Sequence, residues 1–187
     1  IPGNIGGLHW GGVTWSPSHQ MLVMPVNDLP AIIRLIPAAD FKTARRQFPD
    51  RETTEQQGAS HAMSREFFRS PSGLPCLTPP WGWLVGIHTQ TADIAWKVPL
   101  GDFVNLGGVA ISRQGIAFIG ADISPFLRAF DVRTGRLLGQ WPLPTSARAT
   151  PAIYTHQGHE YVIIAAGGHD APTIKLDTKI VAFRLQP

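Results

Sequence analysis

The chain has 187 residues, enough for one domain with a hydrophobic core. Only 16% of the residues are charged, while 19 Gly and 17 Pro supply turn-formers, a composition more typical of short strands and tight turns than of a helical bundle. The formal net charge is only +3, and the basic residues stand singly or in pairs along the chain. This spacing excludes the clustered basic surface of a nucleic-acid-binding protein. The single cysteine excludes an internal disulfide and a CxxC site.

No stretch of 18 apolar residues occurs, so the sequence predicts no transmembrane helix. The chain begins at Ile1, without an initiator Met or a signal peptide. We therefore expect a piece of a longer protein, with any targeting or membrane segment upstream of Ile1.

Short apolar runs rich in Val, Ile and aromatic residues follow one another along the chain, separated by Gly, Pro, Asp, Asn or Ser. This pattern predicts an all-β fold, and no helical i, i+3, i+4 periodicity is sustained. The predicted strands cover residues 20–26, 31–36, 83–87, 94–98, 115–119, 127–131, 136–141, 161–165 and 179–185.

A polar stretch interrupts the strand pattern between residues 37 and 82. We predict an insertion between two strands of one sheet there, with a helical turn at 63–68. Two interpretations remain open. The insertion could be a lid or channel-mouth loop, because long loops often carry function, or it could be a solvated surface excursion. The sequence does not determine whether residues 40–65 are ordered.

Internal repeats indicate the architecture. Residues 86–96 (GIHTQTADIAW) align with 129–139 (AFDVRTGRLLG) at an offset of 43 residues, and 11–13 (GGV) matches 107–109 (GGV). A period near 43 is typical of a four-stranded antiparallel propeller blade, which buries its faces by stacking against copies of itself.

The 43-residue repeat contains a tight turn that ends in Gly135, where glycine supplies a positive φ without steric cost. The first copy has Ala92 at this place. We therefore predict a different or a strained turn at Ala92.

The repeats predict a single partial β-propeller domain over residues 1–187, with about three blades. We expect the blades at 8–98 (interrupted by the insertion), 106–143 and 149–185. Closed propellers have about four to eight blades, so three would leave two exposed apolar flanks. Missing sequence, or a homo-oligomer, would then complete the ring.

Four stretches carry recognisable motifs: PGNIGGLHWGGVTWSP, GLPCLTPPWGWLVGI, NLGGVAISRQGIAFIGADISPFLRAFDVRTGRLLGQW and ATPAIYTHQGHEYVIIAAGGH. In this order they resemble the C-terminal part of a PQQ-dependent (quinoprotein) glucose dehydrogenase of the membrane-bound type. The first resembles the family's G-G-x-N-W element, and the last resembles its A-T-P … A-A-G-G-H end segment. The resemblance covers nearly the whole chain except residues 40–65.

The resemblance implies an eight-bladed propeller enzyme that oxidises glucose or related aldoses and polyols with PQQ and passes electrons to ubiquinone. It implies a periplasmic protein, membrane-associated through an N-terminal segment that is absent here. PQQ is a flat tricarboxylate quinone, so it needs cationic or donor groups and an aromatic surface. In the family a Ca²⁺ or Mg²⁺ ion polarises the quinone, and an Asp acts as the base.

The resemblance places that catalytic Asp and the metal ligands upstream of the matched region. We therefore predict no catalytic residue and no metal ligand in this chain, and no activity of the chain alone. Whether PQQ binds this piece stays open. Several polar residues are candidates by residue type only and are better explained as structural: Asp102, Asp122, Asp177, His156 and His159.

The resemblance assigns cofactor contacts at the first motif. His9 and Trp10 fall on the family's Asn-Trp pair, whose Asn contacts the quinone. An imidazole at this place could still donate one hydrogen bond. Trp10 could instead pack between blades.

Four further cofactor-binding candidates follow from the resemblance. Leu106 and Gly107 match the position where related alcohol dehydrogenases bring Trp-Gly-Gly near the cofactor, and Leu106 could supply only an apolar contact. His169 falls on the family's C-terminal His beside the PQQ pocket. Lys175 aligns with a family Lys that could face a carboxylate.

A second class of function remains open: a degenerate, stand-alone propeller fragment that serves as a binding or assembly module and is completed by self-association. A third, weaker interpretation is a non-catalytic propeller scaffold of the outer-membrane assembly type.

Overall fold

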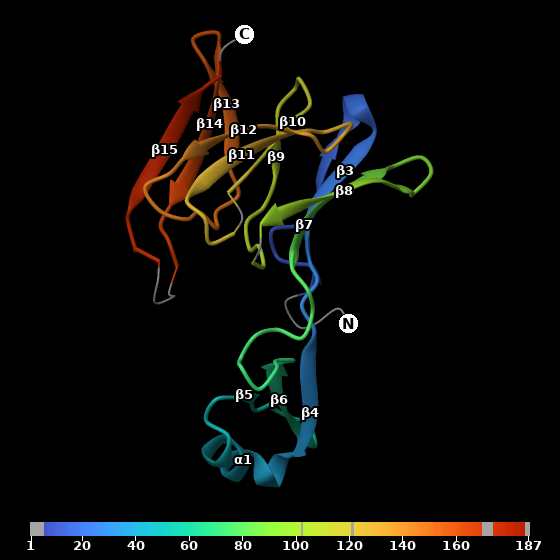
Figure 1. The fold of residues 1–187 in the computed structure, drawn as a ribbon, viewed down its shortest axis with the longest axis vertical. Helices are drawn as coiled ribbons and strands as arrows, with labels where there is room; N and C mark the ends of the chain where they lie inside the picture. Colours follow the sequence, from blue (N-terminus) through green and yellow to red (C-terminus); the bar gives the residue numbers. More distant parts are fainter. Residues whose placement is uncertain (1–5, 102, 121, 170–173, 186–187) are drawn as a thin grey trace. The chain divides into compact units, whose positions relative to one another are not determined.

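The computed structural model describes residues 6–101, 103–120, 122–169 and 174–185 (Figure 1). The chain divides into two compact units, Gly7–Asp28 with Pro79–Pro187, and Ile1–Gly6 with Leu29–Thr78. Strands make up most of the regular structure, which confirms the all-β prediction. Among the described residues, none of the helices has the length and apolar character needed to cross a membrane.

The first sheet of the larger unit is antiparallel and has the order β1–β3–β7–β8, with β2 also paired to β3. Its β3 and β7 are neighbours although more than fifty residues separate them, so the predicted insertion does lie between two strands of one sheet. The elements are β1 (Gly7–Leu8), β2 (Thr14–Ser16), the short 3₁₀ turn η1 (Pro17–His19), β3 (Met21–Asn27), β7 (Gly82–His88) and β8 (Ile94–Gly101).

The second sheet has four antiparallel strands, and the third has three strands in the part that the structure describes. The second consists of β9 (Ala110–Ile111), β10 (Ile116–Ile119), β11 (Phe126–Asp131) and β12 (Leu137–Pro142). The third consists of β13 (Ala152–His156), β14 (His159–Ala166) and β15 (Lys179–Arg184). The third sheet thus departs from the expected four strands per blade.

The three sheets of the larger unit stack face to face, as Figure 1 shows from their side-by-side ribbons. The middle sheet buries both faces, because successive side chains of a strand point to opposite sides. On β10, Ala117 and Ile119 pack into the core shared with the first sheet, while Phe118 packs into the core shared with the third. This stacking explains why β10 is a continuous apolar sequence, Ile116–Ile119.

Trp96 joins the first and second sheets. Its buried indole N–H donates a hydrogen bond to the carbonyl oxygen of Val132, at 2.9 Å, and its ring covers Gly135 so closely that a Cβ there would lie 2.6 Å from the indole. Gly135 has φ +69°, and Ala92, its counterpart in the first copy, has φ +60°. The turn at Ala92 is therefore the strained alternative of the two that the sequence left open.

The smaller unit has its own sheet, in the order β4–β6–β5. Its elements are β4 (Ala31–Pro37), the turn η2 (Ala38–Asp40), α1 (Phe41–Gln47), β5 (Glu52–Thr54) and β6 (His61–Phe67). The longer segment of this unit is Leu29–Thr78, so the predicted strand at 31–36 forms but belongs to this sheet.

The predicted helical turn at 63–68 is wrong, because residues 63–67 lie in strand β6. Ala62 and Ser64 are buried two residues apart, which is the period of a strand, and β6 pairs along its length with β4. The polar segment is therefore a small folded unit.

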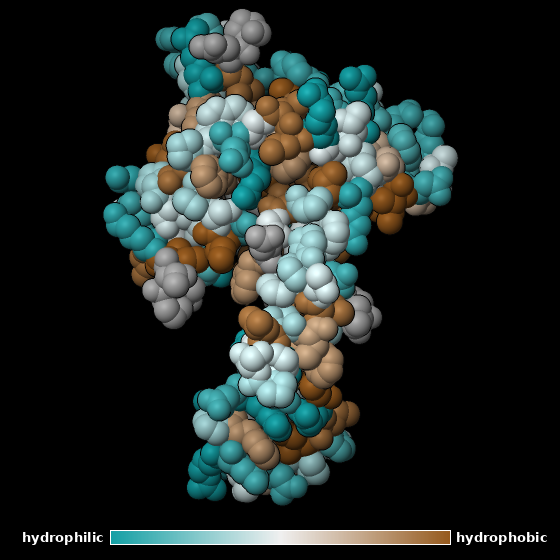
Figure 2. Space-filling model, viewed as in Figure 1, coloured by the Kyte–Doolittle hydropathy of each residue, from teal (hydrophilic) through white to brown (hydrophobic). Residues whose placement is uncertain are grey.

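Both units carry apolar surface on the face drawn in Figure 2.

The charges of the smaller unit pair with one another. Glu66 accepts hydrogen bonds from Arg34 and Arg51, and Arg65 pairs with Glu52. The hydrogen bond from Arg34 holds the pKa of the Glu66 carboxyl below its ordinary value. Since these groups are at the surface, the pairs contribute little to stability.

Candidate functional site

The connections that lead into β2, β9 and β13, one in each sheet, lie side by side. A Cβ on Gly11, before β2, would lie 2.9 Å from the carbonyl oxygen of Gly107, before β9. A Cβ on Gly108 would lie 2.8 Å from the carbonyl oxygen of Gly11 and 2.1 Å from the Thr150 hydroxyl, before β13. The repeated Gly-Gly pairs thus permit a close backbone approach. We call the end of the larger unit where these connections meet the shared end.

Strands β3, β10 and β14 return to this same end, because each is antiparallel to the strand before it, β2, β9 or β13. The residues just after β10 and β14, and the last residue of β3, therefore also belong to the shared end. Two contacts show this directly. Asn27 bonds to Asn105 in the connection before β9, and His169 bonds to Ser146 in the connection before β13.

His9 is held by two hydrogen bonds from the protein. The backbone N–H of Gly11 donates to Nδ1 at 3.0 Å, and Nε2 lies 3.1 Å from Oδ1 of Asn105. Since Nδ1 accepts, a neutral ring carries its proton on Nε2 and donates it to Asn105. The ring N–H is therefore already used inside the protein. Trp10 is 69% exposed, and its ring lies 6.0 Å from that of His9, so it does not pack between sheets within the described residues.

Asn105 is the centre of this network and is fully buried. The side chain of Asn27 forms two hydrogen bonds with the backbone of Asn105, as a neighbouring strand would. Asn27 Nδ2 donates to the Asn105 carbonyl at 2.8 Å, and Asn27 Oδ1 accepts from the Asn105 N–H at 2.9 Å. The Nδ2 group of Asn105 has no hydrogen-bond partner in the described part of the chain. A buried amide donor without a partner is costly in free energy.

Leu106 and Gly107 follow directly, with Leu106 half-buried and Gly107 buried. Gly107 lies against Gly11, so its contribution here is the close approach of two backbones.

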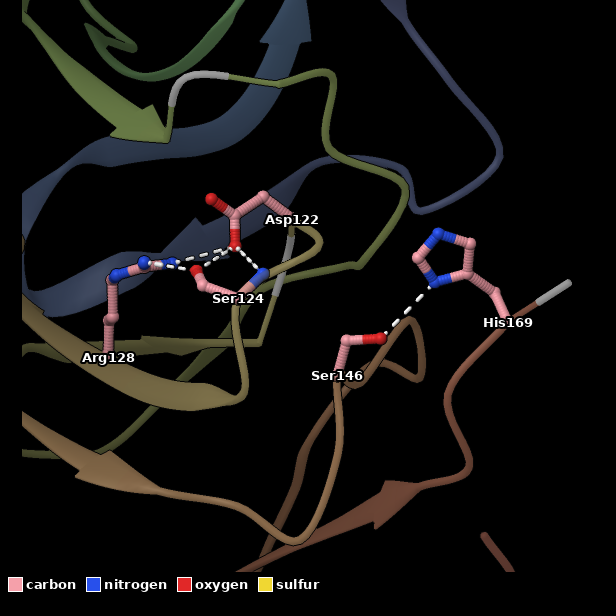
Figure 3. Close-up of polar contacts among 5 residues, drawn as sticks. All are labelled: Asp122, Ser124, Arg128, Ser146 and His169. Carbon is pink, nitrogen blue, oxygen red and sulfur yellow. Dashed lines mark hydrogen bonds and ion pairs between the residues drawn. The ribbon is translucent and has the colours of Figure 1, made fainter. Parts of the chain in front are cut away.

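His169 is nearly buried and lies at the end of the third sheet (Figure 3). Its Nδ1 is 3.2 Å from the hydroxyl oxygen of Ser146, and the backbone N–H of Gly168 donates to the Ser146 carbonyl at 2.9 Å. Lys175 has an exposed side chain, while its carbonyl accepts a hydrogen bond from the Thr145 hydroxyl at 2.5 Å. The Ser146, His169 and Lys175 segments are thus fixed to one another.

Comparison with known proteins identifies this architecture. The sequence profile of the glucose/ethanol/alcohol dehydrogenase β-propeller domain, designated PQQ, matches residues 1–162. The chain belongs to this PQQ β-propeller family. The family membership confirms the resemblance to quinoprotein dehydrogenases, and the fold is a partial propeller.

Two curated relatives and one solved structure illustrate the similarity of this PQQ-family chain. It is 33% identical to quinoprotein glucose dehydrogenase A of Acinetobacter calcoaceticus, over 99% of this chain and 26% of that protein. It is 28% identical to a quinate/shikimate dehydrogenase (quinone) of Acinetobacter baylyi, over 90% of this chain and 24% of that protein. Quinohemoprotein alcohol dehydrogenase from Comamonas testosteroni has the same fold, with a TM-score of 0.69 and 21% identity over 98% of this chain and 27% of that chain. The chain thus spans about a quarter of the relatives it matches.

The acidic candidates of this PQQ-family chain differ in their environments. Asp122 is buried, and its Oδ1 accepts hydrogen bonds from the backbone and hydroxyl groups of Ser124 and from Arg128 (Figure 3). Its charge is therefore balanced by Arg128, which favours the structural explanation. Asp177 accepts a bond from the Thr178 N–H, and Asp102 lies outside the described residues.

Of the two histidines predicted to be structural, His159 contacts β15, and His156 pairs with His159 across the β13–β14 hairpin. Both ring nitrogens of His159 lie 3.0 Å from a guanidinium nitrogen of Arg184. Within the described ranges, no three His, Cys, Asp or Glu side chains are placed to hold a metal ion.

Sequence reasoning missed Asn27, Asn105 and Ser146. A signal was available, because Asn27 ends an apolar strand and Asn105 directly precedes the second Gly-Gly pair. A polar residue at the end of a buried strand has to find a partner, and in a stacked fold that partner comes from the next repeat.

Proposed function

We propose that this chain is the C-terminal propeller portion of a PQQ-dependent dehydrogenase that oxidises glucose or related aldoses and polyols. The electrons pass to ubiquinone, and the whole protein works in the periplasm, attached to the membrane by a segment outside this chain. The chain alone is inactive. The observation that carries the proposal is that three stacked sheets bring the His9, Asn105 and His169 segments to one shared end.

The groups at the shared end fit part of a flat quinone with carboxylates. Trp10 offers an exposed aromatic face for the rings, and the exposed Lys175 offers a cation. Nδ2 of Asn105 is a buried donor that lacks a partner. His9 orients the Asn105 amide and contributes its ring surface, because its own N–H is engaged.

PQQ, when bound, would supply the two-electron redox chemistry. The residues of this chain bind and orient it, with the Ser146 hydroxyl fixing the ring of His169. Proton abstraction from the sugar needs a base, and we assign it to the upstream part of the protein. Two observations support this assignment: Asp122 is paired with Arg128, and Asp177 is already bonded to backbone.

A segment exchange tests the proposal. This chain replaces the matching quarter of quinoprotein glucose dehydrogenase A from Acinetobacter calcoaceticus, and PQQ-dependent dye reduction with glucose is measured. We expect the chimera to retain PQQ-dependent oxidation and the 187-residue chain alone to show none. A folded chimera that does not respond to PQQ, or a clear metal-dependent signal from the isolated chain, would overturn the proposal.

The third sheet favours a second candidate, a binding or assembly module that self-associates. In the described part of the chain, β15 pairs only with β14, and Ile180 on β15 is 70% exposed. A groove of about 1100 Å³ lies between the second and third sheets, with the aromatic side chains of Trp141 and Phe183 in its lining. An unpaired strand edge beside apolar surface is a template for strand addition.

Light scattering coupled to size-exclusion chromatography separates the two candidates. Self-association through β15 predicts a defined dimer or trimer that Ile180→Lys converts to a monomer. A monomer at all concentrations would exclude the assembly module.

A further inference from the structure

Arg148 is a charged residue of the shared end that neither the motifs nor the contacts described above employ. It lies in the connection before β13, between Ser146, which bonds to His169, and Thr150, which contacts Gly108. Its neighbour Ala147 is fully buried against Gly120 in the core of the second and third sheets. The backbone that carries Arg148 is therefore fixed at the shared end.

Arg148 is partly buried, and its guanidinium has no counter-ion among the residues that the structure describes. It forms no hydrogen bond or ion pair with any other residue in the ranges that the structure describes. Burial alone lowers its pKa from the ordinary value, with no compensating charge. Arg128, on the neighbouring sheet, is by contrast paired with Asp122. Withdrawing a cation from water without a partner is unfavourable, so Arg148 contributes nothing to the fold through its charge.

We propose that Arg148 binds a carboxylate group of the ligand at the shared end. A guanidinium presents a planar fork of donors that matches a carboxylate in a bidentate arrangement. The side chains fixed at the shared end carry hydroxyl, amide and imidazole groups, and the buried Asp122 is already paired with Arg128. An anionic ligand would therefore meet an unpaired cation there and no unpaired buried carboxylate among the described residues.

This inference rests on the proposed function for the identity of the ligand, and two ligands would bring the required chemistry. PQQ itself carries carboxylates. A carboxylate-bearing polyol, such as the quinate in the name of one relative, would bring the same group as a substrate. The two sources predict different responses to the same substitution.

The test compares Arg148→Gln with Arg148→Lys and with Arg113→Gln, a matched control in the exposed turn after β9. Binding of PQQ, its trimethyl ester, quinate and glucose to the 187-residue chain is measured by isothermal titration calorimetry. If the cofactor supplies the carboxylate, Arg148→Gln lowers the affinity for PQQ about tenfold or more, and Arg148→Lys lowers it less. The affinity for the trimethyl ester is then the same in the parent and in Arg148→Gln. If the substrate supplies the carboxylate, Arg148→Gln lowers the affinity for quinate, while the affinities for PQQ and glucose do not change.

Two further readouts separate this inference from a structural role and from the proposed function. The urea midpoint of Arg148→Gln should equal that of the parent, because a lost structural contact would lower it. The NMR signal of the Arg148 Nε–H group should shift with citrate, a tricarboxylate unrelated to PQQ. A shift with citrate but not with PQQ, together with weaker quinate binding in Arg148→Gln, keeps the carboxylate site and removes the cofactor assignment. Equal PQQ affinity and equal quinate affinity in parent and Arg148→Gln, or no response of Arg148 to any carboxylate, overturns the inference.

Discussion

The imidazole of His9 and the side-chain amide of Asn105 share a hydrogen bond of 3.1 Å across 96 residues of sequence. It ties the connection before β2 to the connection before β9. Because the Gly11 N–H occupies Nδ1, the bond also fixes the ring in its Nε2–H form. The shared end is thus held together by amide and imidazole side chains as well as by the close glycine backbones.

Replacing Asn105 with Ala tests this network. The substitution removes the acceptor for His9 and a fully buried side chain, so the free energy of unfolding should fall by about 1–3 kcal/mol. The ¹⁵N shift of His9 Nε2 should also change, because this N–H loses its acceptor, while the Gly11 N–H still holds Nδ1. Urea unfolding and NMR measure the two effects. Gln114→Ala, at an exposed amide, is the control, and equal losses in both variants would contradict the network.

The glycine contacts at the shared end predict a sharp position dependence. A Cβ on Gly108 would lie 2.1 Å from the Thr150 hydroxyl and 2.8 Å from a backbone oxygen, so Gly108→Ala should force the connections apart and cost about 1–3 kcal/mol. Gly167→Ala is the matched control, because the nearest described atom to its Cβ would be the Asp177 carbonyl oxygen, at an ordinary contact distance of 3.5 Å. Thermal unfolding of both variants checks this. Similar melting temperatures would show that the connections do not pack as described.

Ala92 gives a prediction of opposite sign. Its φ of +60° is a left-handed conformation that costs an L-residue about 1–2 kcal/mol, and glycine adopts it without this cost. Ala92→Gly should therefore raise the free energy of unfolding by about 1 kcal/mol. Ala95→Gly, at an exposed position of β8, should lower it instead. Destabilisation by Ala92→Gly in chemical denaturation would contradict the strained turn.

Asp131 makes the corresponding turn of the second sheet depend on pH. Its carboxylate accepts hydrogen bonds from the backbone N–H groups of Arg133 and Thr134 and from the Thr134 hydroxyl. Burial acts to raise the pKa of Asp131, but these hydrogen bonds outweigh it and hold the pKa below the ordinary value. A lowered folded-state pKa contributes stability above the unfolded pKa near 4, and this stability is lost as the pH falls through the folded value.

The stability difference between the parent and Asp131→Asn should therefore be largest at neutral pH and shrink below about pH 4. Denaturation across pH 7 to 3 measures it. Asp93→Asn, in the first copy of the repeat, is the control for the loss of one negative charge at an exposed position. A difference that stays constant with pH would show that the charge of Asp131 does not act in the turn.

The repeats predicted the stacked sheets because a 43-residue period and alternating apolar strands are local features of the sequence. They also placed the strained turn at Ala92. The bounds of the insertion could not be predicted in this way. β4 has the same apolar strand pattern as the propeller strands, and only its pairing with β6 assigns it to the smaller unit.

The candidate site shows the same limit. The motifs drew attention to His9 and His169, whereas Asn105 becomes visible only when Asn27 of another strand is seen bonded to it. Arg148 stands out because the described part of the chain places no counter-ion beside it, and no local sequence pattern reveals this.

The PQQ affinity of the chimera with quinoprotein glucose dehydrogenase A tests the central claim most directly. His169→Ala should raise the dissociation constant for PQQ about tenfold or more, since it removes a side chain held by Ser146 at the shared end. His156→Ala, at an exposed position of β13, should leave it unchanged. Equal PQQ affinity in both variants and the parent chimera would contradict a cofactor site at this end of the propeller.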